Sequence, residues 1–234
     1  MIFKDKVAIV TAAGQGMGAA IAKDLVEKGA RVVLMSRSEE ATSLAEKLGG
    51  TGLQGSTANI QDLRDLVELT AERYGRIDFL VNNTGHPPKG DLLDISDRDW
   101  QEGFELVLLN VIRMVRLATP HLAKQGGAIV NISTFSAFEP SALFPVSSTF
   151  RAALGSFMKL YADRYAEKNI RINNILPGFI DSYKISEEIK ERIPLKRAGK
   201  VEEIAKTVSF LLSEDAGYIT GQNIRVDGGI TRSI

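Results

Sequence analysis

Short apolar runs rich in β-branched residues alternate with longer helical patterns along this chain, and this alternation restricts the fold more than any other feature. An apolar run of about four to eight residues is typical of a buried strand, and apolar residues that recur every three or four positions are typical of a helix. Strands are expected at Val7–Thr11, Arg31–Ser36, Gly52–Ser56, Ile77–Asn83, Ala128–Ser133, Ile170–Leu176 and Asn223–Val226. Helices are expected near Met17–Lys28, Glu39–Leu48, Gln61–Tyr74, Asp97–Ala123, Ser147–Glu167 and Val201–Leu212. Because parallel strands need crossovers, the seven runs predict an α/β fold, a doubly wound parallel sheet with helices on both faces.

The composition narrows the class of protein further. The 234 residues include 29 Lys and Arg against 29 Asp and Glu, so a strongly basic nucleic-acid binder is not expected. The chain has no cysteine and two histidines far apart in sequence, which excludes disulfides and argues against a metal cluster. No apolar run approaches the roughly 20 residues of a membrane span. We therefore expect one cytoplasmic domain over residues 1–234, without metal, nucleic acid or membrane as partners.

The turn after the first expected strand gives the clearest functional signal. Its sequence, TAAGQGMG over Thr11–Gly18, ends a strand and opens a helix. Small residues let the backbone approach a pyrophosphate, and a helix N-terminus presents unpaired N–H groups and the positive end of the helix dipole. Tight packing alone also produces such turns. Because this is the first strand-to-helix turn of a chain in which strands and helices alternate, dinucleotide binding is the favoured interpretation.

Further segments follow this turn in a recognisable order. They are NNTG (Asn82–Gly85), LLNV with Asn110, GAIVNIS, LPGFIDS (Leu176–Ser182) and ITGQNIRVDGG (Ile219–Gly229). Together with Gly16 and Gly18, which match a TGxxxGxG pattern, they resemble the short-chain dehydrogenase/reductase family over nearly the whole chain. Ala12 replaces the first glycine of that pattern, which costs little if its φ is negative.

The resemblance implies a Rossmann-like fold, a nicotinamide cofactor and a homo-oligomer, since relatives are usually dimers or tetramers; a homotetramer is expected. It assigns the cofactor contacts to Thr11, Gln15, Gly16, Met17, Gly18, Ser36, Arg37, Ser56, Thr57, Asn83, Thr84, Gly85, Arg151, Pro177, Gly178, Ile180 and Ser182.

The end of the second strand bears on the choice of nucleotide. An acidic residue there would bind ribose hydroxyls and repel a 2′-phosphate, but this chain has Ser36 followed by Arg37. A guanidinium can bind a phosphate through two hydrogen bonds, so NADP(H) is favoured over NAD(H). Arg37 could also be a solvated loop charge. Gln15 stands where many NADP-using relatives have a second basic residue, and Ser56 stands where the family has an adenine-side aspartate.

The catalytic pattern departs from the family. The resemblance implies a serine, tyrosine and lysine supported by an asparagine, with the tyrosine as proton donor. Asn110 is present and Thr134 replaces the serine, but Ser147 stands in the tyrosine position and Arg151 in the lysine position. A phenol titrates near ~10, whereas an aliphatic hydroxyl is far less acidic and an arginine stays charged. Ordinary carbonyl reduction is therefore expected to be weak or absent.

Other residues could supply the proton. His86 follows the NTG turn and Tyr183 follows the PG turn, although a solvent-facing histidine and a packing tyrosine are the simpler interpretations. The basic residues of Phe179–Gly199 are consistent with an anionic substrate and equally with a solvated helix face.

Three functions remain open. The first is an NADP(H)-dependent oxidoreductase that acts on a small-molecule hydroxyl/carbonyl pair with a relocated or substrate-borne proton donor. The second is a nucleotide-binding sensor or supporting subunit without turnover. The third is a redox-neutral lyase resembling halohydrin dehalogenases, which carry arginine in the lysine position but keep the tyrosine and lose the glycine turn.

Overall fold

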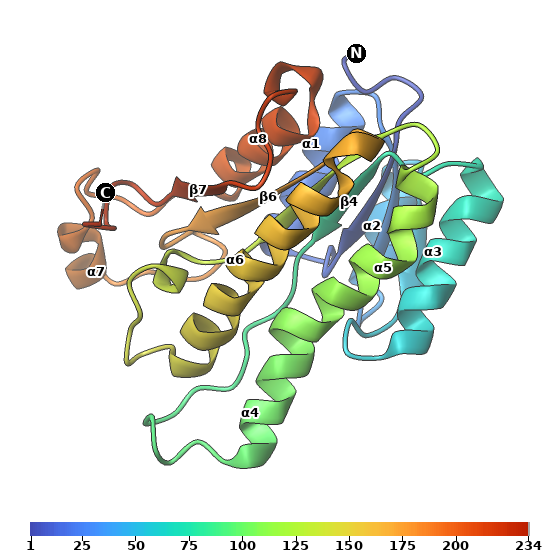
Figure 1. Ribbon diagram of the computed structural model, residues 1–234. Helices are drawn as coiled ribbons and strands as arrows, with labels where there is room; N and C mark the ends of the chain where they lie inside the picture. The colour runs from blue at the N-terminus through green and yellow to red at the C-terminus, as the bar shows by residue number, and fades with distance from the viewer. Residues whose placement is uncertain (234) are drawn as a thin grey trace.

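Seven strands form one parallel sheet in the computed structural model, which describes residues 1–233. The strands are β1 (Val7–Thr11), β2 (Arg31–Ser36), β3 (Thr51–Gln54), β4 (Phe79–Asn82), β5 (Gly127–Ile132), β6 (Ile170–Pro177) and β7 (Asn223–Val226). They lie in the order β3-β2-β1-β4-β5-β6-β7 (Figure 1). The chain builds the sheet outward from β1 to β3, returns to place β4 on the other side of β1, and continues to β7, so the switch point lies between β1 and β4. This topology confirms the expected doubly wound, Rossmann-like α/β fold.

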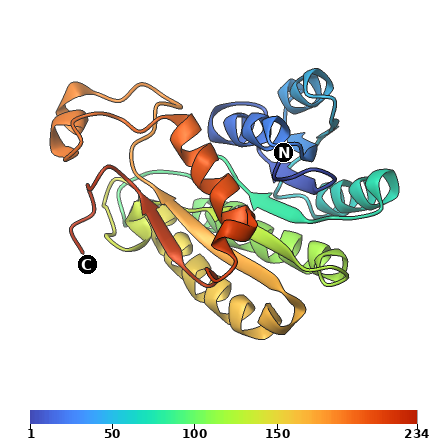
Figure 2. The same ribbon diagram turned by 90° about the horizontal axis from the view of Figure 1, so that it is seen from above.

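Helices cover both faces of this sheet. They are α1 (Gly16–Glu27), α2 (Glu40–Lys47), α3 (Ile60–Tyr74), α4 (Asp97–Phe104), α5 (Asn110–Leu122), α6 (Pro145–Tyr165), α7 (Glu187–Arg192) and α8 (Val201–Leu212). Apolar residues of α1, α2 and α8 pack with Ala8 and Val10 of β1, whereas those of α3, α5 and α6 pack with Ile9 on the opposite face (Figure 2). Because alternate side chains of a strand point to opposite faces, a strand buried on both sides needs a continuous apolar run.

The expected helix over Asp97–Ala123 is wrong as a single element. The structure interrupts it with a π-helical turn at Glu105–Leu109, between α4 and α5. Nδ2 of Asn110 donates to the carbonyl oxygen of Leu106 within this turn. Arg113 contacts Glu105 over 2.6 Å and donates to the carbonyl oxygen of Ala58 over 3.1 Å, which links the turn to the loop after β3. A π-helical turn shifts the register of the residues that follow, and such turns are frequent at functional sites.

The connection between β6 and α8 also contains an element that the sequence did not indicate separately. The short helix α7 begins after Ser186, whose hydroxyl accepts a hydrogen bond from the backbone N–H of Ile189 over 3.4 Å. The connections after β4, β5 and β6 leave the same edge of the sheet, at the lower left of Figure 1. Ligands of open α/β sheets bind at this carboxyl edge. Within residues 1–233, no helix is long and apolar enough to cross a membrane.

Candidate functional site

The glycine-rich turn between β1 and α1 has a conformation that larger residues would disturb. Gly16 has a φ of +56°. A Cβ atom on Gly18 would collide with the carbonyl oxygen of Ala12 and lie 2.8 Å from Nδ2 of Asn83. The hydroxyl of Thr11 donates to Asn83 O over 2.7 Å, and Nδ2 of Asn83 donates to Ala12 O over 3.1 Å. These contacts hold the turn against β4 and bring its backbone close to any ligand above it.

The N-terminus of α1 has no side-chain cap. Gln15 occupies the capping position without accepting a hydrogen bond, and the first turn contains no acidic residue. Asn59, Ser96 and Ser186 cap α3, α4 and α7, whereas α2 and α6 also begin without a side-chain cap. The first N–H groups of a helix need acceptors, and a phosphate is a suitable one. The turn therefore fits the pyrophosphate of a dinucleotide.

Ala12 does not have the negative φ that would let an alanine replace the family's glycine at little cost. Its φ is +46°, in the left-handed region that favours glycine. The alanine is therefore strained at this position. The cause is tertiary, because the Ala12 carbonyl accepts from Asn83 while the next N–H, that of Ala13, donates to Met35 O over 3.0 Å.

Replacing Ala12 by glycine is expected to stabilise the protein. A left-handed backbone costs a non-glycine residue roughly 1–2 kcal/mol, and a glycine removes this cost. A glycine also increases the conformational entropy of the unfolded chain, which lowers stability by roughly 0.4–1 kcal/mol. We expect Ala12→Gly to raise the free energy of unfolding by about 0.5–1 kcal/mol, measured by urea unfolding. The control is Ala13→Gly, at a fully buried alanine outside the left-handed region, which should destabilise the protein. Equal losses in both variants would contradict the strain at Ala12.

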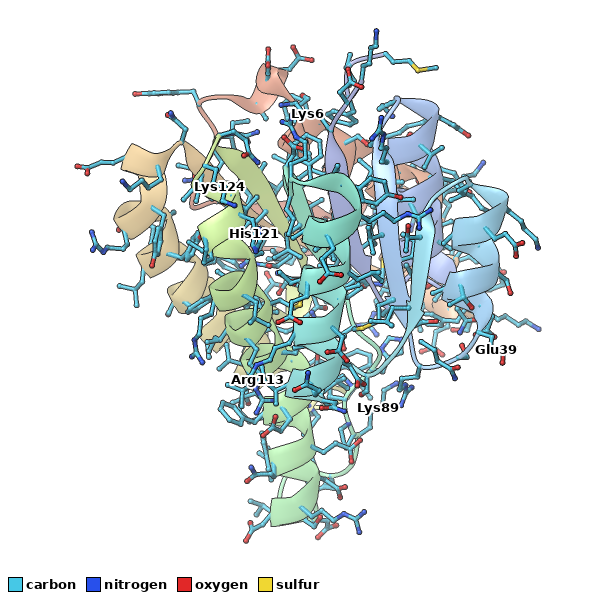
Figure 3. All side chains as sticks on the ribbon, turned by 90° about the vertical axis from the view of Figure 1, so that its right-hand side faces the viewer. Lys6, Glu39, Lys89, Arg113, His121 and Lys124 are labelled. Atoms are coloured by element: carbon cyan, nitrogen blue, oxygen red, sulfur yellow. The ribbon has the colours of Figure 1, made fainter. Side chains whose placement is uncertain are left out.

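A hollow of about 740 Å³ opens beside this turn, on the α2 side. Its lining includes Gly14 and two cationic residues, Arg37 and Lys47, together with Glu39 and Glu40. Glu39 lies at the outer rim of the molecule (Figure 3). Lys47 was not singled out from the sequence, since a lysine in the last turn of a helix is ordinary. The hollow brings the predicted phosphate ligand Arg37 to the glycine turn, although its contact with a phosphate remains a prediction.

Ser36 and Ser56 have local roles in the structure. The hydroxyl of Ser36 donates to Ser38 O over 2.8 Å and accepts from the N–H of Ala41 over 3.2 Å, so it shapes the start of α2. The N–H of Ser56 donates to the carboxylate of Asp62 over 2.7 Å. Asp62, in the first turn of α3, thus supports the loop on the expected adenine side. Sequence counting did not find it, because it lies beyond the aligned position.

A second hollow, of about 680 Å³, lies between the glycine turn and the segment after β6. Gly16 and Ser182 line it together, and a Cβ atom on Gly16 would lie 3.3 Å from Cβ of Ser182. Ile180 is buried in the same segment and forms an isolated parallel β-bridge with Gly199. The structure therefore brings Ser182, which follows β6, close to the first turn. Direct contacts of Met17, Thr57, Gly85, Pro177, Gly178 and the other assigned residues with a cofactor remain predictions.

Arg151 lies buried where the resemblance places a lysine. The residue is 8% exposed; its Nε donates to Oγ of Ser147 over 3.3 Å, and its Nη1 donates to the carbonyl oxygen of Ile132. Burial lowers the pKa of Arg151 from 12.5 to about 10, so the guanidinium stays charged at neutral pH. The structure thus brings Ser147 and Arg151 of α6 to the carboxyl end of β5, next to Ser133 and Thr134.

Thr134 and Asn110 complete the predicted set. The hydroxyl of Thr134 accepts long hydrogen bonds of 3.4 Å from N and Oγ of Ser136, which leaves its own proton free to donate. Asn110 is buried, and its amide nitrogen is engaged with Leu106 in the π-helical turn. Within residues 1–233, no hydrogen bond joins Asn110 to Thr134, Ser147 or Arg151.

His86, in the loop after β4, contacts Tyr183, in the segment after β6. Their rings make an edge-to-face contact with centroids 5.8 Å apart. Partial burial and the charges of Lys89 and Arg151 lower the pKa of His86 below 6.5, and burial raises the pKa of Tyr183 above 10. The other histidine, His121, lies in the upper half of the view in Figure 3, apart from Lys89 in the lower half. Within residues 1–233, no group of three or more His, Cys, Asp or Glu side chains could hold a metal ion.

A row of asparagines that the sequence analysis missed supports the sheet beneath the site. Asn82, Asn131, Asn174 and Asn223 occupy neighbouring positions on β4, β5, β6 and β7. Each side-chain amide donates to the carbonyl of the next asparagine over 2.8–2.9 Å. Only the pairing register, which a single sequence does not give, brings these residues into line.

The predicted catalytic set can orient a carbonyl group but lacks a strong proton donor. Its members are Asn110, Thr134, Ser147 and Arg151. Ser147 and Thr134 each keep an O–H free to donate, while Arg151 supplies fixed positive charge. A general acid works best with a pKa near the operating pH, and no phenol occupies the central position. The arrangement is suited to binding and polarising a carbonyl oxygen more than to protonating it.

Comparison with known proteins agrees with this architecture. A family model described as Enoyl-(Acyl carrier protein) reductase matches residues 11–231. Dehydrogenase/reductase SDR family member 4 of Caenorhabditis elegans is 36% identical over 250 residues, which cover 97% of this chain and 96% of the relative. The Homo sapiens protein of the same name is 35% identical, with 96% and 87% covered. The 3-oxoacyl-(acyl-carrier-protein) reductase FabG of Thermotoga maritima is 33% identical, with 98% and 99% covered. The chain therefore belongs to the short-chain dehydrogenase/reductase family of nicotinamide-dependent oxidoreductases.

Proposed function

We propose that this chain binds NADP(H) in preference to NAD(H) and acts on a hydroxyl/carbonyl pair of a small molecule through an atypical site. The site consists of Asn110, Thr134, Ser147 and Arg151. The observation that carries the proposal is the uncapped, close-fitting turn at Gly16 and Gly18 beside the hollow that contains Arg37. The names of the relatives, which include a dehydrogenase/reductase and a 3-oxoacyl reductase, support the hydroxyl/carbonyl pair.

Each site residue has a role that its contacts permit. The cofactor, when bound, supplies or accepts a hydride. Arg151, held by Ser147 and Ile132, would donate to the hydroxyls of the nicotinamide ribose. Thr134 would donate to the carbonyl oxygen of the substrate, and Ser147 would reach that oxygen through water because its side chain is short. A positioned general acid contributes typically ~10²–10⁴-fold, so turnover without one is expected to be slow.

Arg37 is expected to set the nucleotide preference. Loss of a charge-assisted, bidentate phosphate contact costs about 1.5–3 kcal/mol, or roughly 10–100-fold in affinity. We therefore expect Arg37→Gln to weaken NADPH binding by about that factor and to leave NADH binding within about twofold. Titration by cofactor fluorescence measures both constants. Arg73→Gln, at an exposed cation in the last turn of α3, is the charge-matched control. If both variants weaken NADPH equally, the effect is long-range charge rather than recognition at Arg37.

A second candidate function is cofactor binding without turnover. The buried contact of Arg151 with Ser147 favours it, because this pair replaces the usual proton donor and its activating lysine with an alcohol and a permanent cation. NADPH and NADH titration, followed by a screen of ketones, aldehydes and quinones for cofactor consumption, separates the two. Tight binding without consumption of cofactor across the screen would select the sensor or supporting subunit. Consumption of NADPH would select the oxidoreductase.

The remaining features of the proposal follow from the resemblance. We propose one cofactor-binding domain over the chain, a cytoplasmic setting and a homotetramer. Leu160 on α6 and Phe210 on α8 are large apolar side chains on the outside of the protomer, which is consistent with burial between subunits.

A further inference from the structure

Arg151 is a buried cation without a counter-ion. Within residues 1–233 no Asp or Glu forms an ion pair with it, and burial alone accounts for its altered pKa. A lysine in this place could release its proton, but a guanidinium remains charged. A buried charge is unfavourable unless an opposite charge or several hydrogen bonds compensate it. The chain itself provides two acceptors, the Ser147 hydroxyl and the Ile132 carbonyl, and no anion.

Two unpartnered hydroxyls follow the carboxyl ends of β4 and β5, and Arg151 contacts the last residue of β5. Within residues 1–233, the buried side-chain atoms without a hydrogen-bonding partner are Oδ1 of Asn82, Oγ1 of Thr84 and Oγ of Ser133. Asn82 pairs in register with Asn131, so Thr84 and Ser133 follow these residues at the carboxyl ends of two adjacent strands. Ser133 is 6% exposed, and the guanidinium of Arg151 contacts the carbonyl of the residue before it. Both hydroxyls are potential donors, whereas the Asn82 oxygen only accepts.

The cofactor of the proposed function does not neutralise this charge. Its pyrophosphate would lie at the α1 N-terminus between Gly16 and Ser182, and its ribose is uncharged. A guanidinium has five N–H groups, and contacts within the chain use two of those of Arg151. Of the three that remain, one can donate to the nicotinamide ribose, and the other two match the paired oxygens of a carboxylate.

We propose that Arg151, Thr84 and Ser133 form a carboxylate-binding subsite, so that the substrate is an oxo acid or hydroxy acid rather than a neutral carbonyl compound. The inference rests on the proposed function, since it names the substrate class of the same site. The proposal explains why Arg151 stands in the lysine position of the family. Arginine binds a carboxylate through two hydrogen bonds, whereas lysine offers a point charge. The carboxylate would also supply the acceptor that each buried hydroxyl lacks.

Calorimetric titration of the full chain, with and without NADPH, tests this subsite. The ligand is oxamate, a carboxylate with an adjacent carbonyl that is not readily reduced, and its uncharged ethyl ester is the comparison. We expect oxamate to bind, the ester to bind at least about tenfold more weakly, and Arg151→Met to weaken oxamate by about tenfold or more. Arg151→Lys should retain part of the affinity, and Ser133→Ala should lower it by a smaller factor. Arg164→Met, at an exposed arginine of α6, should change nothing.

Three results would overturn the subsite: no oxamate binding, equal binding of acid and ester, or unchanged oxamate affinity in Arg151→Met. Chloride that binds at Arg151 in place of oxamate would identify a halide site and would also refute the carboxylate. Oxamate binding that remains in a chain unable to bind NADPH would refute the proposed function while supporting the subsite. If Arg151→Met does not fold, Arg151→Lys and Ser133→Ala still decide, because unchanged affinity in both contradicts the proposal.

Discussion

The double variant Ser147→Tyr/Arg151→Lys is expected to reduce carbonyl substrates at least about 100-fold faster than the natural chain. The variant restores a phenol that can donate a proton and an amine that can lower the pKa of that phenol. A positioned general acid contributes ~10²–10⁴-fold, equivalent to roughly 3–5.5 kcal/mol of barrier. NADPH consumption with a panel of ketones, aldehydes and oxo acids measures the change. Cofactor affinity should stay within about threefold, because the glycine turn and Arg37 are untouched and a lysine at position 151 can still donate to the hydroxyls of the nicotinamide ribose.

The structure supports this restoration at both positions. Ser147 is partly exposed on the first turns of α6, so a ring there can project toward the mouth formed by the loops after β4 and β6. Arg151 already directs its cation to the Ile132 carbonyl at the end of β5, an acceptor that a lysine ammonium can also use. The lysine would retain the positive charge with fewer hydrogen bonds.

Three controls make the result specific. The single variants should gain much less than the double variant, because phenol and amine act as a unit. Thr149→Tyr places the same ring on an exposed position of α6 and should add no activity. A double variant that binds NADPH normally yet remains inert would show that Asn110 and Thr134 do not position a substrate as inferred.

The elements of the fold were predictable because their signals are local. The helix at Val201–Leu212 and the strand at Asn223–Val226 occur where the apolar pattern places them. The buried strand β1 contains a continuous apolar run because helices cover both of its faces. Such patterns depend on residues close in sequence, so a single chain is enough to find them.

The features that the sequence did not predict depend on contacts between distant segments. The π-helical turn before Asn110 is stabilised partly by Arg113, which reaches the loop after β3, and no periodicity indicates that contact. The positive φ of Ala12 accompanies its hydrogen bond with Asn83, 71 positions away. The asparagine row likewise needs the strand register. The candidate site shows the same division: Ser147 and Arg151 were located by spacing, but the absent counter-ion and the unpartnered hydroxyls became visible only in three dimensions.

Gly18→Ala is expected to lower NADPH affinity by at least about 100-fold and to destabilise the chain. The new Cβ would meet the Ala12 carbonyl and lie 2.8 Å from Nδ2 of Asn83, so the turn must move away from β4. Such a movement would displace the backbone N–H groups that we propose bind the pyrophosphate, and losing one or two hydrogen bonds to a charged group, at about 1.5–3 kcal/mol each, gives an effect of this size. Cofactor fluorescence titration and urea unfolding measure the two changes.

The direction of the stability change distinguishes this contact from ordinary helix propensity. Alanine is better than glycine inside a helix by about 1 kcal/mol, so propensity alone would make Gly18→Ala stabilising. Overpacking typically costs about 1–3 kcal/mol or more, and we expect it to prevail because the atoms that the new Cβ meets include backbone that β1 and β4 hold in place. Gly155→Ala in α6 is the matched control, since a Cβ there meets nothing closer than 3.7 Å and should be neutral or stabilising. If both variants stabilise the chain and leave NADPH affinity unchanged, the turn does not hold the cofactor in the way that its geometry indicates.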